Sequence, residues 1–262
     1  SQYAEVRQAV TYLMDRNEFA KQYTEGYGTS LSGYYGLGQQ EYILNKEWVD
    51  KTLNAYTFSV DKAIEVLVKG GWIYDETGAD FSSGIRHKKL DDGTFMPLIL
   101  KWNSTTPNPM SDQIATCLTE EIQAKAGLKI DRTNTDFSTL LDNMTQSGGV
   151  QEYNMFNLAV GFTPISAHWY YFDPKMGGEY NREFLDDKEI YEIALGMKTI
   201  PSEDTAAWDA EWKKLQKRWN YLMPSVPLYS NIYYDFFNKK LTNYNTNSQW
   251  TWYYDMPFAK VA

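Results

Sequence analysis

Residues 6–16 of the chain read VRQAVTYLMDR. The apolar positions of this stretch recur at spacings of three and four residues, at Val6, Ala9, Val10, Leu13 and Met14. This spacing predicts an amphipathic helix that begins close to residue 1 and buries one face. The other face is expected to point to water and carries Glu5, Arg7, Gln8 and Asp15. An ordinary core-facing helix explains the apolar positions but not the whole combination of residues.

Composition limits the possible partners. The 262 residues include 25 Lys and Arg against 34 Asp and Glu, a formal net charge of −9. A nucleic-acid partner is therefore not expected, because binding to phosphate backbones depends on clustered cations. No stretch approaches the roughly 18 consecutive apolar residues of a membrane-spanning helix. The single cysteine, Cys117, provides neither an internal disulfide nor a cysteine metal cluster.

Aromatic residues make up 16% of the chain, with 21 Tyr and 9 Trp. This is more than a core of this size needs, so some of these rings are expected to line a ligand site or an interface.

Residues 97–160 alternate between strand and helix patterns. Strands are predicted at 97–102, 128–132 and 153–160, with helices at 111–126, ending at Gly127, and at 137–144, closed by Gly148-Gly149. This order predicts parallel strands with right-handed crossovers. If the third strand pairs on the far side of the first, the helices cover opposite faces. A crevice then opens at the carboxyl ends of the first and third strands.

The residues expected at this crevice form the candidate ligand site. Trp102, Asn103 and Ser104 leave the end of the first strand, and Gly161, Phe162 and Thr163 leave the end of the third. The loop that follows the third strand adds His168 and Trp169. Aromatic faces would provide stacking area, and Asn103 and Thr163 would provide directed hydrogen bonds.

Other segments have clear local patterns. Ser59 is expected to cap a helix that ends at Gly70-Gly71, and Asp92-Gly93 indicates a hairpin or loop. Residues 26–38 read as a loop, residues 86–89 as a solvated basic loop, and residues 226–238 as an extended segment.

A helix opens at Asp186-Asp187, and Ser202 is expected to cap the next helix. The Trp and Leu residues of this second helix form one stripe, which we interpret as core packing: Trp208, Trp212, Leu215, Trp219 and Leu222.

Four stretches, in order along the chain, carry a family resemblance. Residues 6–16 match the pattern VRQAxxYxxDR, and Val60-Asp61-Lys62-Ala63, Leu67 and Gly71-Trp72 match DPxKAxxLLxxAGW. Gly178, Asn181, Phe184 and Asp187 are similar to GxNxxGYxxxExD, and Pro224 with residues 226–229 is similar to PxxPLY. Together these stretches resemble the oligopeptide- and dipeptide-binding family 5 of bacterial ABC-transporter extracellular solute-binding proteins.

The resemblance implies a fold and a division of the chain. The fold is α/β, of the periplasmic-binding-protein type II class, with a central mixed sheet flanked by helices. The chain is expected to be a carboxy-terminal portion. Residues 1–228 would form the carboxy-terminal lobe, and residues 229–262 a crossing strand and tail that return to an amino-terminal lobe absent from this chain.

The resemblance also implies a function. The chain would belong to the solute-binding component of an ABC importer, which captures a dipeptide, oligopeptide or other small solute between two lobes and delivers it to membrane permease subunits. The protein would be extracytoplasmic. It would lie in the periplasm or, as a lipoprotein, on the outer face of the cell membrane. Asn181 would contact the ligand, or would bond its own backbone in a turn. The family's ligand loop often carries an acid for a peptide's amino terminus, but residues 161–171 contain none, which weakens the case for a peptide.

No catalytic constellation is recognised in the sequence. The two histidines, His87 and His168, are not spaced as a metal site, and no nucleophile elbow or phosphate loop occurs. We therefore expect no enzyme activity, no cofactor and no metal. Two alternatives stay open: a polysaccharide-active enzyme or carbohydrate-binding module that uses the aromatic surface, and a structural or interaction module.

Overall fold

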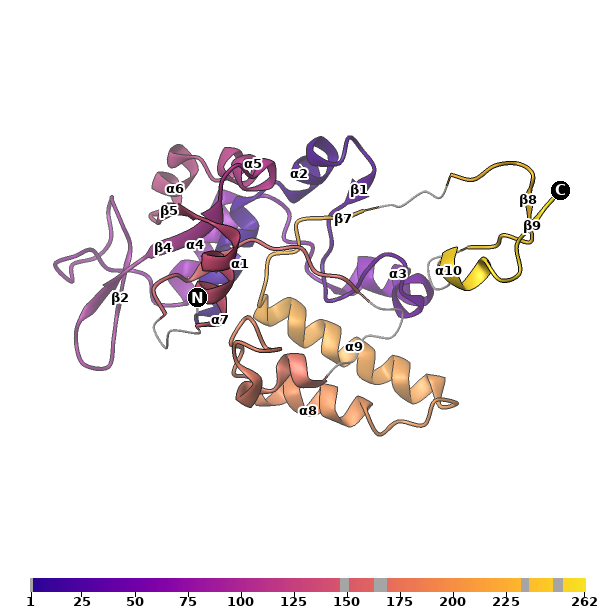
Figure 1. The fold of residues 1–262 in the computed structure, drawn as a ribbon. Coiled ribbons are helices and arrows are strands. Elements are labelled where there is room, and N and C mark those ends of the chain that lie inside the picture. The colour runs from indigo at the N-terminus through magenta and orange to yellow at the C-terminus, as the bar shows by residue number, and fades with distance from the viewer. Residues whose placement is uncertain (1, 147–150, 163–168, 232–235, 247–251) are drawn as a thin grey trace.

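The computed structural model describes residues 2–146, 151–162, 169–231, 236–246 and 252–262. A parallel sheet in the order β5-β4-β6 forms the framework of the α/β body (Figure 1). Its strands are β4 (Ile99–Thr105), β5 (Lys129–Thr135) and β6 (Met155–Phe156). β4 pairs with β5 along its whole length and with β6 on its other side. The predicted parallel order is confirmed, and the antiparallel pairs of the described chain form separate small sheets.

Helices connect these strands. α5 (Pro109–Cys117) and α6 (Glu120–Ala126) lead from β4 to β5, and α7 (Phe137–Thr145) leads towards β6. The prediction of one helix over 111–126 is wrong, because Leu118 leaves the helical conformation and the Thr119 side chain caps α6 by accepting a hydrogen bond from the Ile122 amide. The predicted stop at Gly127 is confirmed, since it has φ +74°. Gln146 caps α7, whereas Gly148 and Gly149 lie outside the described residues.

The connecting helices cover opposite faces of the sheet, as predicted. Neighbouring residues of a strand point to opposite sides. From β4, Asn103 contacts Asn143 of α7, while Ser104 contacts Arg132, whose guanidinium pairs with Asp112 of α5. In Figure 1, α5 and α6 accordingly lie above the sheet and α7 lies below it.

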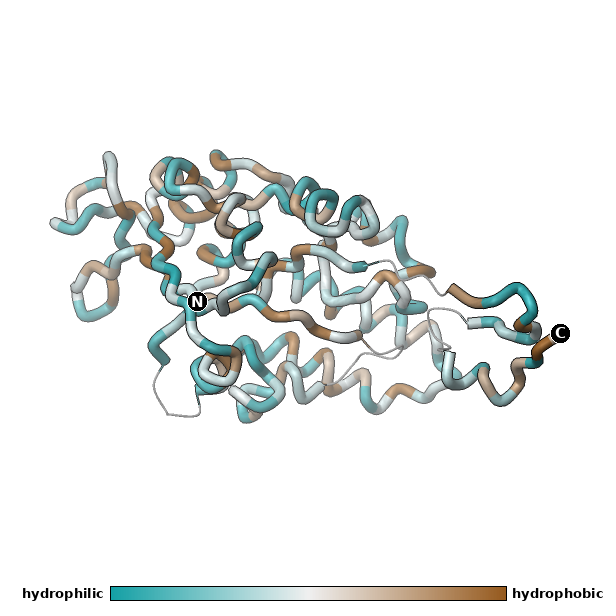
Figure 2. Tube along the Cα trace, turned by 45° about the horizontal axis from the view of Figure 1, so that its top comes forward, coloured by the Kyte–Doolittle hydropathy of each residue, from teal (hydrophilic) through white to brown (hydrophobic). Residues whose placement is uncertain are grey.

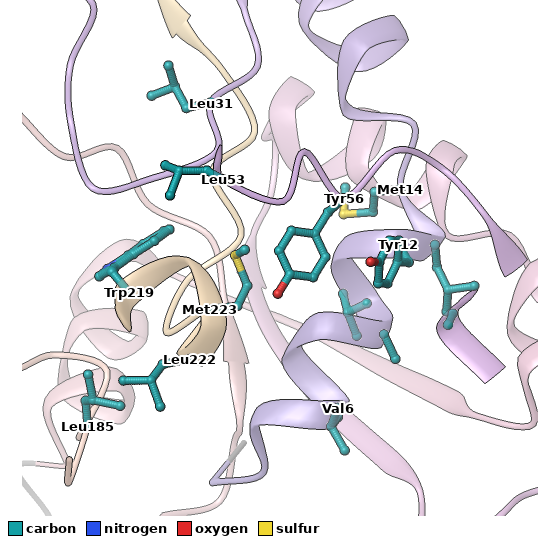
Figure 3. Packing of buried hydrophobic residues seen from close by; sticks show 14 of the residues in the cluster. Val6, Tyr12, Met14, Leu31, Leu53, Tyr56, Leu185, Trp219, Leu222 and Met223 are labelled. Carbon is teal, nitrogen blue, oxygen red and sulfur yellow. The ribbon is translucent and has the colours of Figure 1, made fainter. Parts of the chain in front are cut away.

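The opening motif forms α1 (Ala4–Leu13) and α2 (Arg16–Tyr23). All five predicted apolar positions are buried. The expectation that Arg7 and Gln8 face water is wrong. Arg7 donates to the Leu222 carbonyl at 2.7 Å through its Nη2 atom, and Gln8 donates to the Tyr221 carbonyl. Both partners belong to the last turn of α9, whose carbonyls have no partner within the helix; Figure 3 shows this helix end near α1.

Helices α8 (Lys188–Met197) and α9 (Thr205–Leu222) pack against each other. Trp212 and Trp219 are 1% and 3% exposed, so the stripe is confirmed as core packing. Asp187 caps α8 by accepting from the Ile190 amide. The expected Ser202 cap is wrong: the Asp204 carboxylate accepts from the Ala207 amide and caps α9.

Further helices and strands complete the body. Ser59 caps α4 (Val60–Lys69) as predicted. β2 (His87–Lys89) and β3 (Phe95–Pro97) form the hairpin expected around Asp92-Gly93. The expectation of a solvated loop over 86–89 is wrong, since Arg86 is 7% exposed and donates to the carbonyls of Trp72 and Ala126. The sequence patterns did not predict α3 (Gln40–Thr52). Two short 3₁₀ helices are η1 (Trp169–Phe172) and η2 (Pro174–Met176).

The last part of the chain leaves this body. β7 (Ser230–Asn231) pairs antiparallel with β1 (Gly28–Thr29), a short strand within the predicted loop. Beyond it, α10 (Trp252–Asp255) and the pair β8 (Leu241–Thr242) and β9 (Lys260–Val261) lie in a tail that projects from the body (Figure 1). Hydrophobic residues occur at the end of this tail, as the brown colour next to the C-terminus in Figure 2 shows. Among the described residues, no helix has the length and apolarity needed to span a bilayer.

Candidate functional site

The carboxyl ends of the three parallel strands lie at one edge of the sheet. β4 ends at Thr105 and β5 at Thr135, and these two residues are paired in register. β6 ends at Phe156, after which residues 157–162 continue without regular structure. Ligands of open α/β sheets bind outside this edge, where the connections diverge. The edge is therefore the place to look for a solute.

Trp102, Asn103 and Ser104 lie within β4 rather than beyond its end. All three are at most 2% exposed. Asn103 donates to the Thr135 hydroxyl at 2.9 Å and accepts from Asn143, and Ser104 donates to Asn134 at 2.6 Å. These bonds hold the sheet and its helices together. A ligand role for the three residues stays a prediction.

Trp102 also forms part of a cavity away from the carboxyl edge. Its indole N–H donates to Asn157 at 3.1 Å, and the Arg132 guanidinium lies 4.7 Å from its ring centre. The cavity has a volume of about 580 Å³ and is lined mainly by β5 and α6, together with Gly84 and Ile85. Trp102 therefore faces the side of the sheet that α6 covers.

Phe162 lies at an aromatic wall. Gly161 is exposed and Phe162 is half-buried. The Phe162 ring contacts the Tyr34 ring edge-on, with centres 5.0 Å apart. Tyr34 also contacts Phe172 of η1 at 5.3 Å and Trp219 of α9 at 6.1 Å. We use the name aromatic wall for Tyr34 and Phe162, which connect the predicted loop after β6 to the core.

The backbone at Tyr34 is held by α9. Gln216, which is fully buried, accepts from the Tyr34 amide at 2.7 Å and donates to the Tyr34 carbonyl at 2.8 Å. One turn later, Asn220 donates to the Ser32 carbonyl at 2.7 Å. A side chain at Gly33 would place its Cβ 2.6 Å from the Gln216 oxygen, so only glycine fits there. The position of Tyr34 is thus fixed before any ligand arrives.

The sequence patterns did not single out Tyr34 or Gln216. Residues 26–38 were interpreted as a loop without further role, and Gln216 stands beside a tryptophan stripe that already accounts for α9. The glycine-rich, tyrosine-rich composition of the loop was the available signal. Contacts over 182 residues, such as that between Tyr34 and Gln216, leave no trace in local periodicity.

Four predicted site residues remain, and the structure describes two of them, Trp169 and Asn181. Trp169 of η1 is half-buried, with its ring 6.5 Å from that of Tyr191 on α8 and 5.1 Å from the Lys198 ammonium. Thr163 and His168 lie outside the described residues. The structure therefore places Phe162 and Gly161 together, with Trp169 packed on α8.

Asn181 is a turn residue in the structure. It is fully buried, donates to the carbonyls of Asp173 and Leu185 at 3.2 and 2.8 Å, and accepts from the Leu185 amide at 2.9 Å. The bonds to Leu185 close the turn of residues 181–185 on itself. The side chain bonds backbone, which is the second of the two roles considered for it, and the ligand contact stays a prediction.

The turn of residues 181–185 also carries Glu183. Burial raises the pKa of the Tyr34 phenol above its ordinary value, and the nearby Glu183 carboxylate raises that pKa further. Desolvation also raises the pKa of the Glu183 carboxyl, against the smaller opposing effect of Arg182. The Glu183 residue nevertheless stays accessible to solvent.

Metal chemistry finds no support in the described chain, where no group of three or more His, Cys, Asp and Glu side chains is placed to hold an ion. His87 is engaged through its Nδ1 atom with the Ile85 carbonyl at 3.0 Å, within the β2 region.

Solved structures show the same fold. The oligopeptide-binding protein AppA from Bacillus subtilis, in complex with a nonapeptide, is 17% identical, with a TM-score of 0.70 over 99% of this chain and 48% of its own. Lactococcal OppA, complexed with an endogenous peptide, is 20% identical, with a TM-score of 0.69 over 88% of this chain and 40% of its own. NikA from Brucella suis, in complex with Fe(III)-EDTA, is 19% identical, with a TM-score of 0.62 over 87% of this chain and 42% of its own.

The chain thus spans about half the length of these structures or less. A search among curated proteins found no match. The family model described as the middle part of the bacterial extracellular solute-binding proteins, family 5, matches residues 2–179, more than half of the sequence. The fold confirms the predicted α/β class of periplasmic-binding-protein type II. The chain belongs to family 5 of the bacterial extracellular solute-binding proteins.

Proposed function

We propose that this chain is the carboxy-terminal lobe of the solute-binding component of an ABC importer. It captures a small solute, an oligopeptide or dipeptide, and delivers it to the membrane permease subunits. The observation that carries the proposal is the aromatic wall of Tyr34 and Phe162 after the carboxyl end of β6. Large rings held in place by a buried framework suit the recognition of extended solutes of varied side chains.

The division into lobes supports the same function. Residues 1–228 form the lobe, and residues 229–262 cross to an amino-terminal lobe. The tail exposes large apolar side chains, with Phe236, Trp252 and Phe258 at 94%, 58% and 61% exposure. Such a patch is typical of a surface that another part of a protein covers. A solute would bind between the lobes as they close.

Location and chemistry follow from this role. The parent protein would act outside the cytoplasm, in agreement with the family description of extracellular binding proteins. We propose the periplasm, or the outer face of the cell membrane as a lipoprotein. We propose binding without turnover, since family 5 consists of solute-binding proteins. The carbohydrate alternative is not favoured, because the family model describes solute-binding proteins and the matched structures hold a nonapeptide and Fe(III)-EDTA.

Saturation-transfer NMR with a casein-derived oligopeptide mixture tests the proposal on this chain, because it detects the weak binding expected of half a cleft. We expect signals with the unmodified chain and their loss in Phe162→Ala, equivalent to at least about a tenfold loss of affinity for a buried aromatic contact.

Phe95→Ala is the matched control. Phe95 is also half-buried and contacts a tyrosine edge-on, with the Tyr74 ring centre 5.3 Å away, but it lies on the β2–β3 hairpin before β4. It should leave the signals unchanged. Equal signals from Phe162→Ala, with its fold intact by circular dichroism, would refute the proposed site.

A further inference from the structure

The strand β6 ends at Phe156, and Asn157 is the first residue after it. The Asn157 side chain is half-buried. Its Oδ1 atom accepts a hydrogen bond from the Trp102 indole N–H at 3.1 Å and another from the Ser111 hydroxyl at 3.1 Å. Trp102 and Ser111 are 2% and 0% exposed. Two buried donors, one from β4 and one from α5, therefore hold Asn157 at the carboxyl end of β6.

These bonds decide which way the Asn157 amide faces. An indole N–H can only donate, so the Asn157 atom that faces Trp102 must be the carbonyl oxygen. The Nδ2 atom occupies the other branch of the planar amide. Within the described part of the chain Nδ2 has no hydrogen-bond partner, and it reaches solvent. Asn157 thus presents an oriented N–H2 group at the edge where open α/β sheets bind their ligands.

An N–H2 group in this position suits a carbonyl oxygen, because it offers donors and no acceptor. Every peptide carries such oxygens along its main chain, whatever its side chains are. Asn157 and Phe162 lie in the same connection after β6, five residues apart, so the chain between them spans at most about 18 Å. An extended peptide of about five residues has that reach. One solute can therefore contact both Asn157 and the aromatic wall.

We propose that the Asn157 amide donates a hydrogen bond to a main-chain carbonyl of the solute. The inference rests on the proposed function and adds to it a group that recognises the backbone of a peptide rather than its side chains. Trp102 and Ser111 act on the solute through Asn157, since their bonds orient its amide. They are positioning residues.

Asn157→Asp tests the proposal. It keeps the oxygen that accepts from Trp102 and Ser111, and it replaces the N–H2 group with an acceptor. Saturation-transfer NMR titrations with casein-derived oligopeptides compare this variant with the unmodified chain. We expect at least about a tenfold loss of apparent affinity, the scale of a lost hydrogen bond that leaves an acceptor facing a carbonyl. If Asn157 only held the connection in place, the change would leave the affinity as it was.

Asn154→Asp is the matched control. Asn154 is also half-buried and also accepts through its Oδ1 atom, from the Lys101 amide at 2.9 Å, but it precedes β6 and lies at the other end of that strand. The control adds the same charge and should leave the apparent affinity unchanged. Equal losses in the two variants would show a general effect of charge and would overturn the assignment.

The assigned side-chain amide signals of Asn157 in proton–nitrogen correlation spectra give a second measurement, on the unmodified chain. A hydrogen bond to a carbonyl should shift these signals as peptide is added. Suppose that they stay in place, or that Asn157→Asp binds with full affinity, while Phe162→Ala loses binding. The Asn157 contact then fails and the proposed function stands. If the unmodified chain binds no peptide, both proposals fail.

Discussion

Arg16 shows how one residue of the opening motif organises the lobe. It is 4% exposed and donates to the carbonyls of Leu31, Ala55 and Pro227, which belong to three separate segments. No carboxylate takes part in these bonds. Burial lowers the pKa of Arg16 to about 10, so the guanidinium stays charged at neutral pH. Its planar fork of donors can serve several acceptors at once.

Arg16→Met should therefore destabilise the chain strongly. Three carbonyls would lose a charged donor, and we expect a loss of about 3–5 kcal/mol in the free energy of unfolding, the scale for breaking a buried charged network. Urea denaturation followed by circular dichroism measures it. The exposed Arg182→Met serves as control and should change stability by less than about 0.5 kcal/mol. Similar stabilities of the two variants would show that the Arg16 bonds contribute little.

At this scale, sequence reasoning found part of the site. Phe162 follows from the predicted strand order, which places the end of β6 beside that of β4. Tyr34 does not follow, because it reaches the wall through contacts across the fold. Arg7 and Arg16 stand out in the motif, but their acceptors are backbone carbonyls far along the chain, which no pattern of side chains reveals.

Among the elements, α8 and α9 show how charge supports packing. Arg218 of α9 donates from its Nε atom to Asp187 at 3.0 Å, and Asp187 also caps α8. Burial opposes the ionisation of Asp187, but the hydrogen bonds from Arg218 and the Ile190 amide outweigh it and lower the pKa of this carboxyl. The pair thus links the start of one helix to the middle of the next.

This link should depend on pH. A carboxyl whose pKa is lowered by folding stabilises the native state above its unfolded pKa of about 3.9, and loses that contribution as the pH falls through the lower folded value. We expect the thermal midpoint of the unmodified chain to fall over this acidic range more steeply than that of Asp187→Asn. Calorimetric scans from neutral pH downwards measure both. Parallel curves would contradict the assigned role of Asp187.

The elements themselves were predictable where a strong period coincided with a cap or a glycine stop. α4 has both, with Ser59 and Gly71. The stripe of α9 predicted that helix by its period alone, since its cap is Asp204 and not Ser202. The break between α5 and α6 was not predictable, because Ile114, Leu118 and Ile122 keep the apolar spacing through the break. α3 was missed because its sequence has no clear apolar face, and only Asn45 and Val49 are buried among its residues.

For the whole molecule, the structure consists of an α/β body and a projecting tail. In the body, Gln216 and Asn220 of α9 hold the segment that carries Tyr34. The tail exposes aromatic side chains that the proposed amino-terminal lobe would cover. Both features agree with a lobe that holds one side of a solute, as the coverage of about half of each matched structure suggests.

Hydrogen–deuterium exchange of this chain, with and without saturating casein-derived oligopeptides, tests the location of the site most directly. We expect slower exchange in residues 31–38 and 157–162, which carry the aromatic wall, with the β2–β3 hairpin unchanged. Protection confined to α6 and β5, which line the cavity of about 580 Å³, would contradict the account, as would peptide binding that protects neither of the two segments.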